Sequence, residues 1–96
     1  MDKDSIAPAT NAVKTIGVGT FGEGEAASNA DRLFRVQPGH NAQFALEQAA
    51  ALMSCVYKLT LQAGTQQDAS LIWAAHCLSG MSKALVEDVA HAMLTD

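Results

Sequence analysis

The chain has 96 residues and a formal net charge of −4 at pH 7, from ten acidic and six basic side chains. This length allows one domain at most. The basic residues are scattered along the sequence, which argues against a nucleic-acid-binding protein because such proteins need a clustered basic face. Apolar residues make up 49% of the chain but aromatic residues only 5%, so a single helical hairpin would have a small core.

Neither a targeting segment nor a membrane segment is evident in the sequence. The first ten residues, MDKDSIAPAT, contain two acids and a proline and lack the apolar core of a signal peptide. No segment approaches the roughly 20 consecutive apolar residues that span a bilayer. Two cysteines without an export signal are more often reduced thiols than a disulfide. We therefore expect a cytoplasmic protein that does not bind membranes.

Glycine and small residues dominate residues 1–30, and large apolar side chains are few there. This composition predicts a flexible, disordered N-terminal tail, followed by one domain at residues 31–96. Gly17, Gly19, Gly22 and Gly24 superficially resemble a phosphate-binding loop. However, no apolar strand precedes them and the spacing of a nucleotide-binding motif is absent, so we expect no nucleotide site.

The segment Leu33–Val36 predicts one short strand or an extended arm, because it ends in alternating apolar and charged residues and runs into Gln37-Pro38-Gly39. A lone strand leaves its backbone hydrogen-bonding groups unpaired. The simplest partner for it is the same segment of a second copy.

A first helix is predicted from the N-cap Asn41 to about Ala63, with Gly64 as its end. Its apolar residues form two stripes at helical spacing, which implies cover on more than one side and hence an oligomer. The main stripe contains Leu46, Ala49, Ala50, Met53, Val56, Tyr57 and Leu61. The second stripe contains Phe44, Leu52, Cys55 and Leu59.

A second, antiparallel helix is predicted from about Ala69 to Leu94, after a short linker and a cap at Asp68 or Ser70. Gly80 in its interior indicates a close packing contact. No heptad run long enough for an extended coiled coil is evident. Lys83, Glu87 and Asp88 are expected to face outward. The expected inner face contains Leu71, Ala75, Leu78, Ser82, Leu85, Val89 and Met93.

Candidate chemistry is sparse. Cys55 and Cys77 would lie level in the hairpin, but two buried thiols are a more economical interpretation than a redox pair. His40, His76 and His91 lack the spacing of metal ligands, although a two-fold axis leaves an interfacial metal open. We expect no bound cofactor and no metal site within one copy. No catalytic motif is evident either, so the sequence predicts a protein that is not an enzyme.

Three segments resemble a family of small uncharacterised bacterial proteins known only as a domain of unknown function. They are LFRVQPG at 33–39, ALEQAAALMSCV at 45–56 and LIWAAHCLSGMSKALVEDV at 71–89. The resemblance covers residues 33–94, and its pattern is an LFxVxxG arm followed by a helical hairpin. It implies no known activity, substrate or cofactor.

The sequence as a whole predicts an all-α protein: an antiparallel two-helix hairpin that dimerises into a four-helix bundle, preceded by the tail and the extended arm. Its predicted function is a non-catalytic interaction or regulatory module that acts as a homodimer. A small-ligand- or metal-binding bundle, and a subunit that joins an unidentified helical protein, remain alternatives. Trp73 either anchors an interface or covers the end of the hairpin. The predicted interface contains Leu33, Phe34, Val36, Phe44, Leu52, Cys55, Leu59 and Trp73.

Overall fold

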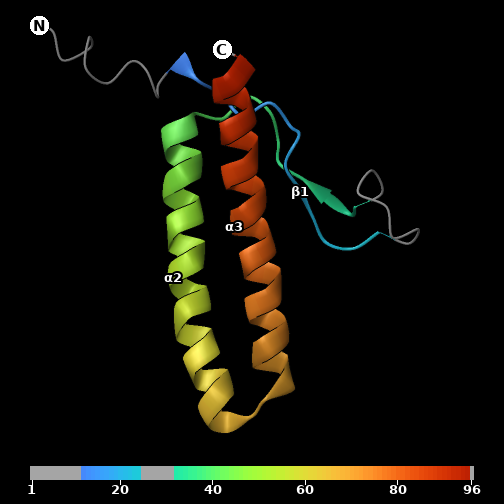
Figure 1. The fold of residues 1–96 in the computed structure, drawn as a ribbon, viewed down its shortest axis with the longest axis vertical. Coiled ribbons are helices and arrows are strands. Elements are labelled where there is room, and N and C mark those ends of the chain that lie inside the picture. The colour runs from blue at the N-terminus through green and yellow to red at the C-terminus, as the bar shows by residue number, and fades with distance from the viewer. Residues whose placement is uncertain (1–11, 25–31, 96) are drawn as a thin grey trace, which may run out of the picture.

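Two long helices form an antiparallel hairpin in the computed structural model, which describes residues 12–24 and 32–95. Helix α2 spans Ala42–Gln66 and helix α3 spans Ala69–Thr95 (Figure 1). They are preceded by two short antiparallel strands, β1 at Thr20–Phe21 and β2 at Phe34–Arg35. The predicted helical hairpin is therefore confirmed. Much of the predicted tail, residues 1–11 and 25–30, lies outside the described residues.

Helix α2 begins as predicted. The Oδ1 atom of Asn41 accepts hydrogen bonds from the backbone N–H groups of Gln43 at 2.8 Å and Phe44 at 3.3 Å. These bonds satisfy two of the amide groups that a helix start leaves free, so Asn41 is the N-cap.

The end of α2 lies three residues beyond the predicted one. The helix continues through Gly64 to Gln66, and Gln67 closes it in the left-handed conformation at φ 52°. The Gln67 N–H donates to the Ala63 carbonyl at 2.8 Å, which satisfies a carbonyl group at the helix end. Only Gln67 and Asp68 connect the two helices, so the reversal is tight.

The two helices meet along a seam with three-four spacing. The buried and half-buried residues of α2 on this seam are Ala42, Ala45, Ala49, Leu52, Val56, Leu59 and Ala63. Those of α3 are Leu71, Ala75, Leu78, Ser82, Leu85, Val89 and Ala92. A three-four repeat along both helices is the spacing with which two antiparallel helices pack along a continuous seam.

The seam also reassigns the two predicted stripes of α2. Leu52 and Leu59, which were predicted to face a second copy, lie on the seam. Leu46 and Met53, which were predicted to face the second helix, are exposed instead. On α3 the predicted inner face is correct except at its end, where Met93 is exposed and Ala92 is buried.

Small side chains bring the helices close together, as their abundance predicted. The Ser82 hydroxyl donates a hydrogen bond to the Ala49 carbonyl across the seam at 3.0 Å, and both residues are buried. At the open end, a cluster of small and medium apolar side chains forms the core, to which residue 13 contributes from outside the helices. The cluster contains Val13, Ala42, Ala45, Val89 and Ala92.

We call residues 13–24 and 32–41 the arm. Its two halves run antiparallel and are joined by backbone hydrogen bonds, among them Thr15 N–H to His40 O at 2.8 Å and Val36 N–H to Gly19 O at 2.9 Å. The sheet pairs Phe21 with Phe34, whose rings stack at 5.0 Å. The strand at 34–35 thus has its partner within the same chain, which corrects the prediction that a second copy supplies it.

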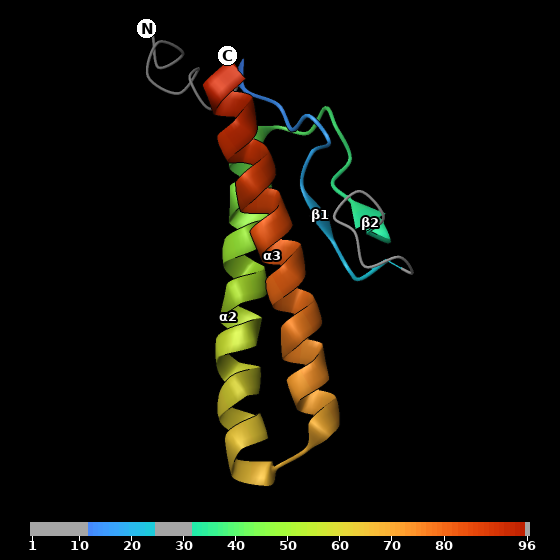
Figure 2. The same cartoon turned by 45° about the vertical axis from the view of Figure 1, so that its right-hand side comes forward.

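The arm lies beside α3, along the half of the hairpin that is distant from the connecting loop (Figure 2). A Cβ atom at Gly80 would lie 3.5 Å from the Cβ of Phe21, so the close contact predicted at Gly80 is made with the arm. Residues 12–24 therefore differ from the flexible tail that their composition suggested. The sheet also joins residues on both sides of the predicted boundary at 30 and 31.

Candidate interaction surfaces

Asp88 fastens the arm to α3. Its side chain is fully buried, although the sequence predicted that it faces outward. One carboxylate oxygen accepts the N–H of Ile16 at 2.7 Å, and the other accepts those of Val18 at 2.5 Å and Gly19 at 2.8 Å. A buried carboxylate is costly unless hydrogen bonds replace its water, and these three donors do so. We call this arrangement the clasp.

Two glycines make the clasp possible. Gly17 has φ at 88°, a left-handed conformation that turns successive N–H groups towards one point. A Cβ atom at Gly19 would overlap the carbonyl oxygen of Ala84, so only glycine allows this approach of the arm to α3. Gly17 and Gly19, two of the four glycines that resembled a phosphate loop, therefore belong to an anion-binding turn, and the carboxylate of Asp88 occupies it.

Thr15 joins the two halves of the arm. Its side chain is 2% exposed, and its hydroxyl donates to the Gln37 carbonyl at 2.6 Å. The same oxygen accepts the His40 N–H at 3.0 Å. The arm is thus held by specific polar contacts both within itself and to α3.

The other side of the hairpin is apolar and exposed. Residues seven apart lie on nearly the same face of a helix, so Leu46 and Met53 share a face of α2, and Ile72, Val86 and Met93 share a face of α3. Their exposed fractions are 37%, 47%, 59%, 47% and 55% in that order. None of the described segments covers these side chains. We call these five residues the bare face.

A shallow hollow of about 460 Å³ shows that the two stripes lie on the same side of the molecule, because residues from both helices line it. It lies at the loop end of the bare face. Its lining includes Thr60, Ala63 and Gly64 from α2, and Ile72, His76 and Ser79 from α3. A second hollow of about 360 Å³ lies on the opposite side, where Thr15, Val36 and His40 of the arm meet both helices.

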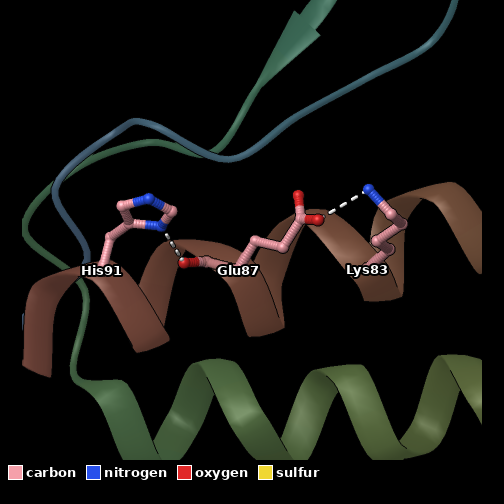
Figure 3. Close-up of polar contacts among 3 residues, drawn as sticks. All are labelled: Lys83, Glu87 and His91. Carbon is pink, nitrogen blue, oxygen red and sulfur yellow. Dashed lines mark hydrogen bonds and ion pairs between the residues drawn. The ribbon is translucent and has the colours of Figure 1, made fainter. Parts of the chain in front are cut away.

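A polar ridge follows α3 on its outer surface (Figure 3). Lys83 Nζ contacts Glu87 Oε2 at 2.6 Å, and the ring N–H at Nδ1 of His91 donates to the Glu87 carbonyl at 2.9 Å. Lys83 and Glu87 face outward as predicted. An ion pair this exposed stabilises the fold little, and the charged ridge borders the apolar face without interrupting it.

The eight residues predicted for an interface lie on several elements, and three of them, Val36, Phe44 and Leu52, line the second hollow. Val36 is a buried residue of the arm, and Leu52 and Leu59 are half-buried on the seam. The others are at least partly exposed but lie on different elements: Leu33 and Phe34 on the arm, Phe44 and Cys55 on α2, and Trp73 on α3. The bare face was missed because its members Leu46 and Met53 were assigned to the seam. Trp73 is exposed and packs its ring at 5.3 Å from that of His76.

Neither cysteines nor histidines form a reactive cluster in the described part of the chain. Cys55 and Cys77 are free thiols, the first exposed and the second half-buried. Within residues 12–24 and 32–95, no group of three or more His, Cys, Asp or Glu side chains is placed to hold a metal ion. His40 lies in the arm, whereas His76 and His91 lie near opposite ends of α3.

Comparison with known proteins gives one finding. A family model described as a protein of unknown function (DUF3077) matches residues 15–92. The match begins in the arm well before Leu33, where the resemblance seen in the sequence began. Neither the curated proteins nor the solved structures gave a match. Of the described helices, none has the length and apolarity to cross a membrane.

Proposed function

We propose that this chain, which belongs to the DUF3077 family, is a non-catalytic interaction module that pairs with a second copy of itself through the bare face. One observation carries the proposal: five large apolar side chains are exposed on one side of the hairpin, whereas the arm covers part of the other side (Figure 2). Large contiguous apolar patches on a soluble domain usually mark an interaction surface.

The size of the bare face suits a dimer. A helix of 25 residues is about 37 Å long, and two packed helices are roughly 20 Å wide. The whole side of the hairpin that carries the bare face therefore has a footprint of roughly 750 Å² per copy, comparable to the about 800 Å² per partner of a standard protein–protein interface. Pairing two such faces would produce a four-helix bundle.

The chemistry of the face also suits a dimer. Its centre is aliphatic and contains methionine, while Lys83 and Tyr57 stand at its margins by helical phase. An apolar centre with a polar rim is the usual composition of a stable interface. Because the face carries no charged side chain at its centre, a second copy can cover it without burying an unpaired charge.

Two further parts of the proposal rest on other observations. We also propose that the module is non-catalytic, because the sequence contains no motif that pairs a nucleophile with a base. Two free thiols, Cys55 and Cys77, support a reducing compartment, and we place the protein in the cytoplasm.

The test is a matched pair of substitutions. Met53→Asp places a charge at the centre of the bare face, whereas Leu61→Asp makes the same change on an exposed residue of α2 outside that face. We expect a dimer for the unaltered chain and for Leu61→Asp, and a monomer for Met53→Asp, by native mass spectrometry and light scattering. Circular dichroism establishes that both variants keep their helices.

Two outcomes would contradict the proposal. A dimer of Met53→Asp as stable as that of Leu61→Asp would show that the bare face is not the interface. A monomeric unaltered chain would show that the partner is a different protein, the alternative in which this hairpin completes a larger helical complex.

A further inference from the structure

The bare face is uneven along its length. At the loop end it contains the hollow of about 460 Å³, whose lining combines the small residues Ala63 and Gly64 of α2 with the exposed Ile72 of α3. At the open end, Leu46, Val86 and Met93 project as large exposed side chains. On α2, the large side chain of Leu46 at one end and the hollow beside Thr60 at the other make the face complementary to a reversed copy of itself.

Met53 lies midway between the two ends. It is seven residues from Leu46 and seven from Thr60, and hence about 10 Å along α2 from each. On α3, Ser79 holds the same position, seven residues from Ile72 and seven from Val86. A rotation about a line through Met53 and Ser79 therefore exchanges the large end with the hollow.

Resting on the proposed self-association, we infer that the two copies pair in opposite directions, about a two-fold axis that crosses both helices near Met53 and Ser79. Helix α2 of one copy then lies over α2 of the other, and Leu46 of each copy lies over the hollow beside Thr60 of its partner. Every contact away from the axis occurs twice, as in any two-fold interface.

The alternative two-fold axis runs parallel to the helices. It places α2 of one copy over α3 of the other at the same level, so that Met53 faces Ser79 of its partner. Hollow would then face hollow, and bulk would face bulk. An unfilled apolar hollow loses packing contacts, and crowded side chains are forced out of their preferred rotamers, so this pairing is disfavoured at both ends.

Single cysteines distinguish the two arrangements. The background chain carries Cys55→Ser and Cys77→Ala, and native mass spectrometry first establishes that it is a dimer. Chains that also carry Met53→Cys are then oxidised, once alone and once mixed with chains that carry Ser79→Cys. The reversed pairing predicts a disulfide between the two Met53→Cys chains. The reversed pairing predicts a disulfide yield for Met53→Cys at least about tenfold higher than for Leu61→Cys, because a disulfide requires α-carbons within about 7 Å.

A second pair tests the ends of the face. Chains with Leu46→Cys and chains with Thr60→Cys are mixed, and the reversed pairing predicts disulfides in the mixture but not in either chain alone. If instead Met53→Cys joins Ser79→Cys in the mixture and not itself, the orientation is wrong while self-association stands. If the unaltered chain and the cysteine-free background are both monomeric, the proposed orientation and the proposed self-association are both wrong.

Discussion

The two sides of the hairpin differ in how their apolar surface is covered. Both seam helices are rich in alanine, so their contact buries little apolar area per residue and leaves each side of the seam in need of cover. On one side the arm supplies it within the chain, through hydrogen bonds to Asp88. On the other side large apolar residues stay exposed, and none of the described segments reaches them.

The arm side is therefore held by specific polar contacts, whereas the bare face offers non-specific apolar contacts. The clasp depends on particular atoms: one carboxylate, three N–H groups and a glycine that admits the arm. The bare face depends only on apolar surface and its shape, and such surfaces tolerate exchange among aliphatic residues. Substitutions on the arm side should therefore reduce the stability of one chain, whereas those on the bare face should change association.

The most damaging change we expect is Asp88→Ala. It leaves the buried N–H group of Gly19 and the partly buried N–H groups of Ile16 and Val18 without their acceptor, and a buried unpaired donor costs about 1–3 kcal/mol. Because the arm can detach and expose these groups to water, we expect a total loss of about 3–5 kcal/mol in urea unfolding. Hydrogen exchange at residues 16–19 should become fast.

The neighbouring acid is the matched control. Glu87 is exposed and paired with Lys83, so Glu87→Ala should change the unfolding free energy by about 0.5 kcal/mol or less. Equal losses for the two variants would mean that the clasp does not hold the arm.

A pair of glycines should respond with opposite signs. Gly19→Ala places a Cβ atom 2.9 Å from the carbonyl carbon of Ala84, and backbone cannot give way cheaply, so we expect a loss of about 2–3 kcal/mol. Gly64 lies within α2 with no atom within 4 Å of an added Cβ. Gly64→Ala should stabilise the chain by about 0.5–1 kcal/mol, because alanine favours a helix over glycine.

Thermal and urea unfolding of the two glycine variants provide the measurement. A Gly19→Ala chain as stable as the unaltered one would show that the arm does not approach α3 as closely as the structure places it. Loss of stability in Gly64→Ala would contradict the open surroundings of that position.

Local signals in the sequence were sufficient for the hairpin. The Asn41 cap, the tight turn and the range of α3 follow from residues close together in the chain, and all were predicted. The arm was not predictable in this way, because its glycines read as flexibility when taken alone. Their role depends on Asp88, some seventy residues away in sequence.

The candidate surface could be predicted only in part, for a related reason. Asp88 and Glu87 are adjacent acids on a helix, and nothing local indicates that one is buried and the other exposed. Similarly, α2 has two apolar stripes. Judged by hydrophobicity alone, Met53 is a better candidate for the seam than Ala45. Close approach of the helices favours the small residues instead, and that choice depends on the partner helix.

A smaller effect is expected at Thr15, within the arm. Thr15→Val keeps the shape of the side chain but removes its hydrogen bonds to Gln37 and His40. Both partners are exposed residues that water can reach, so we expect a loss of about 1–2 kcal/mol in urea unfolding. Thr65→Val, at an exposed position near the loop, should change stability by less than about 0.5 kcal/mol.

The smallest effect concerns Asp68, which repeats at the surface what Asp88 does in the interior. The Ser70 hydroxyl donates to its carboxylate at 2.7 Å and the Ser70 N–H at 2.9 Å. These bonds hold the pKa of Asp68 below its ordinary value of 3.8, with the hydroxyl as the largest cause. A carboxylate whose pKa is lowered by folding stabilises the folded chain above pH 3.8, and this contribution is lost as the pH falls through the lowered pKa.

Ser70→Ala removes the hydroxyl and should raise the pKa of Asp68 towards 3.8, as followed by NMR titration of its carboxyl carbon. Stability at neutral pH should hardly change, because Asp68 is fully exposed and water replaces the lost bond. An unchanged pKa would show that the backbone N–H groups alone stabilise this carboxylate. Its role would then match that of Asp88, which is held by backbone donors, and burial would be the difference between the two acids.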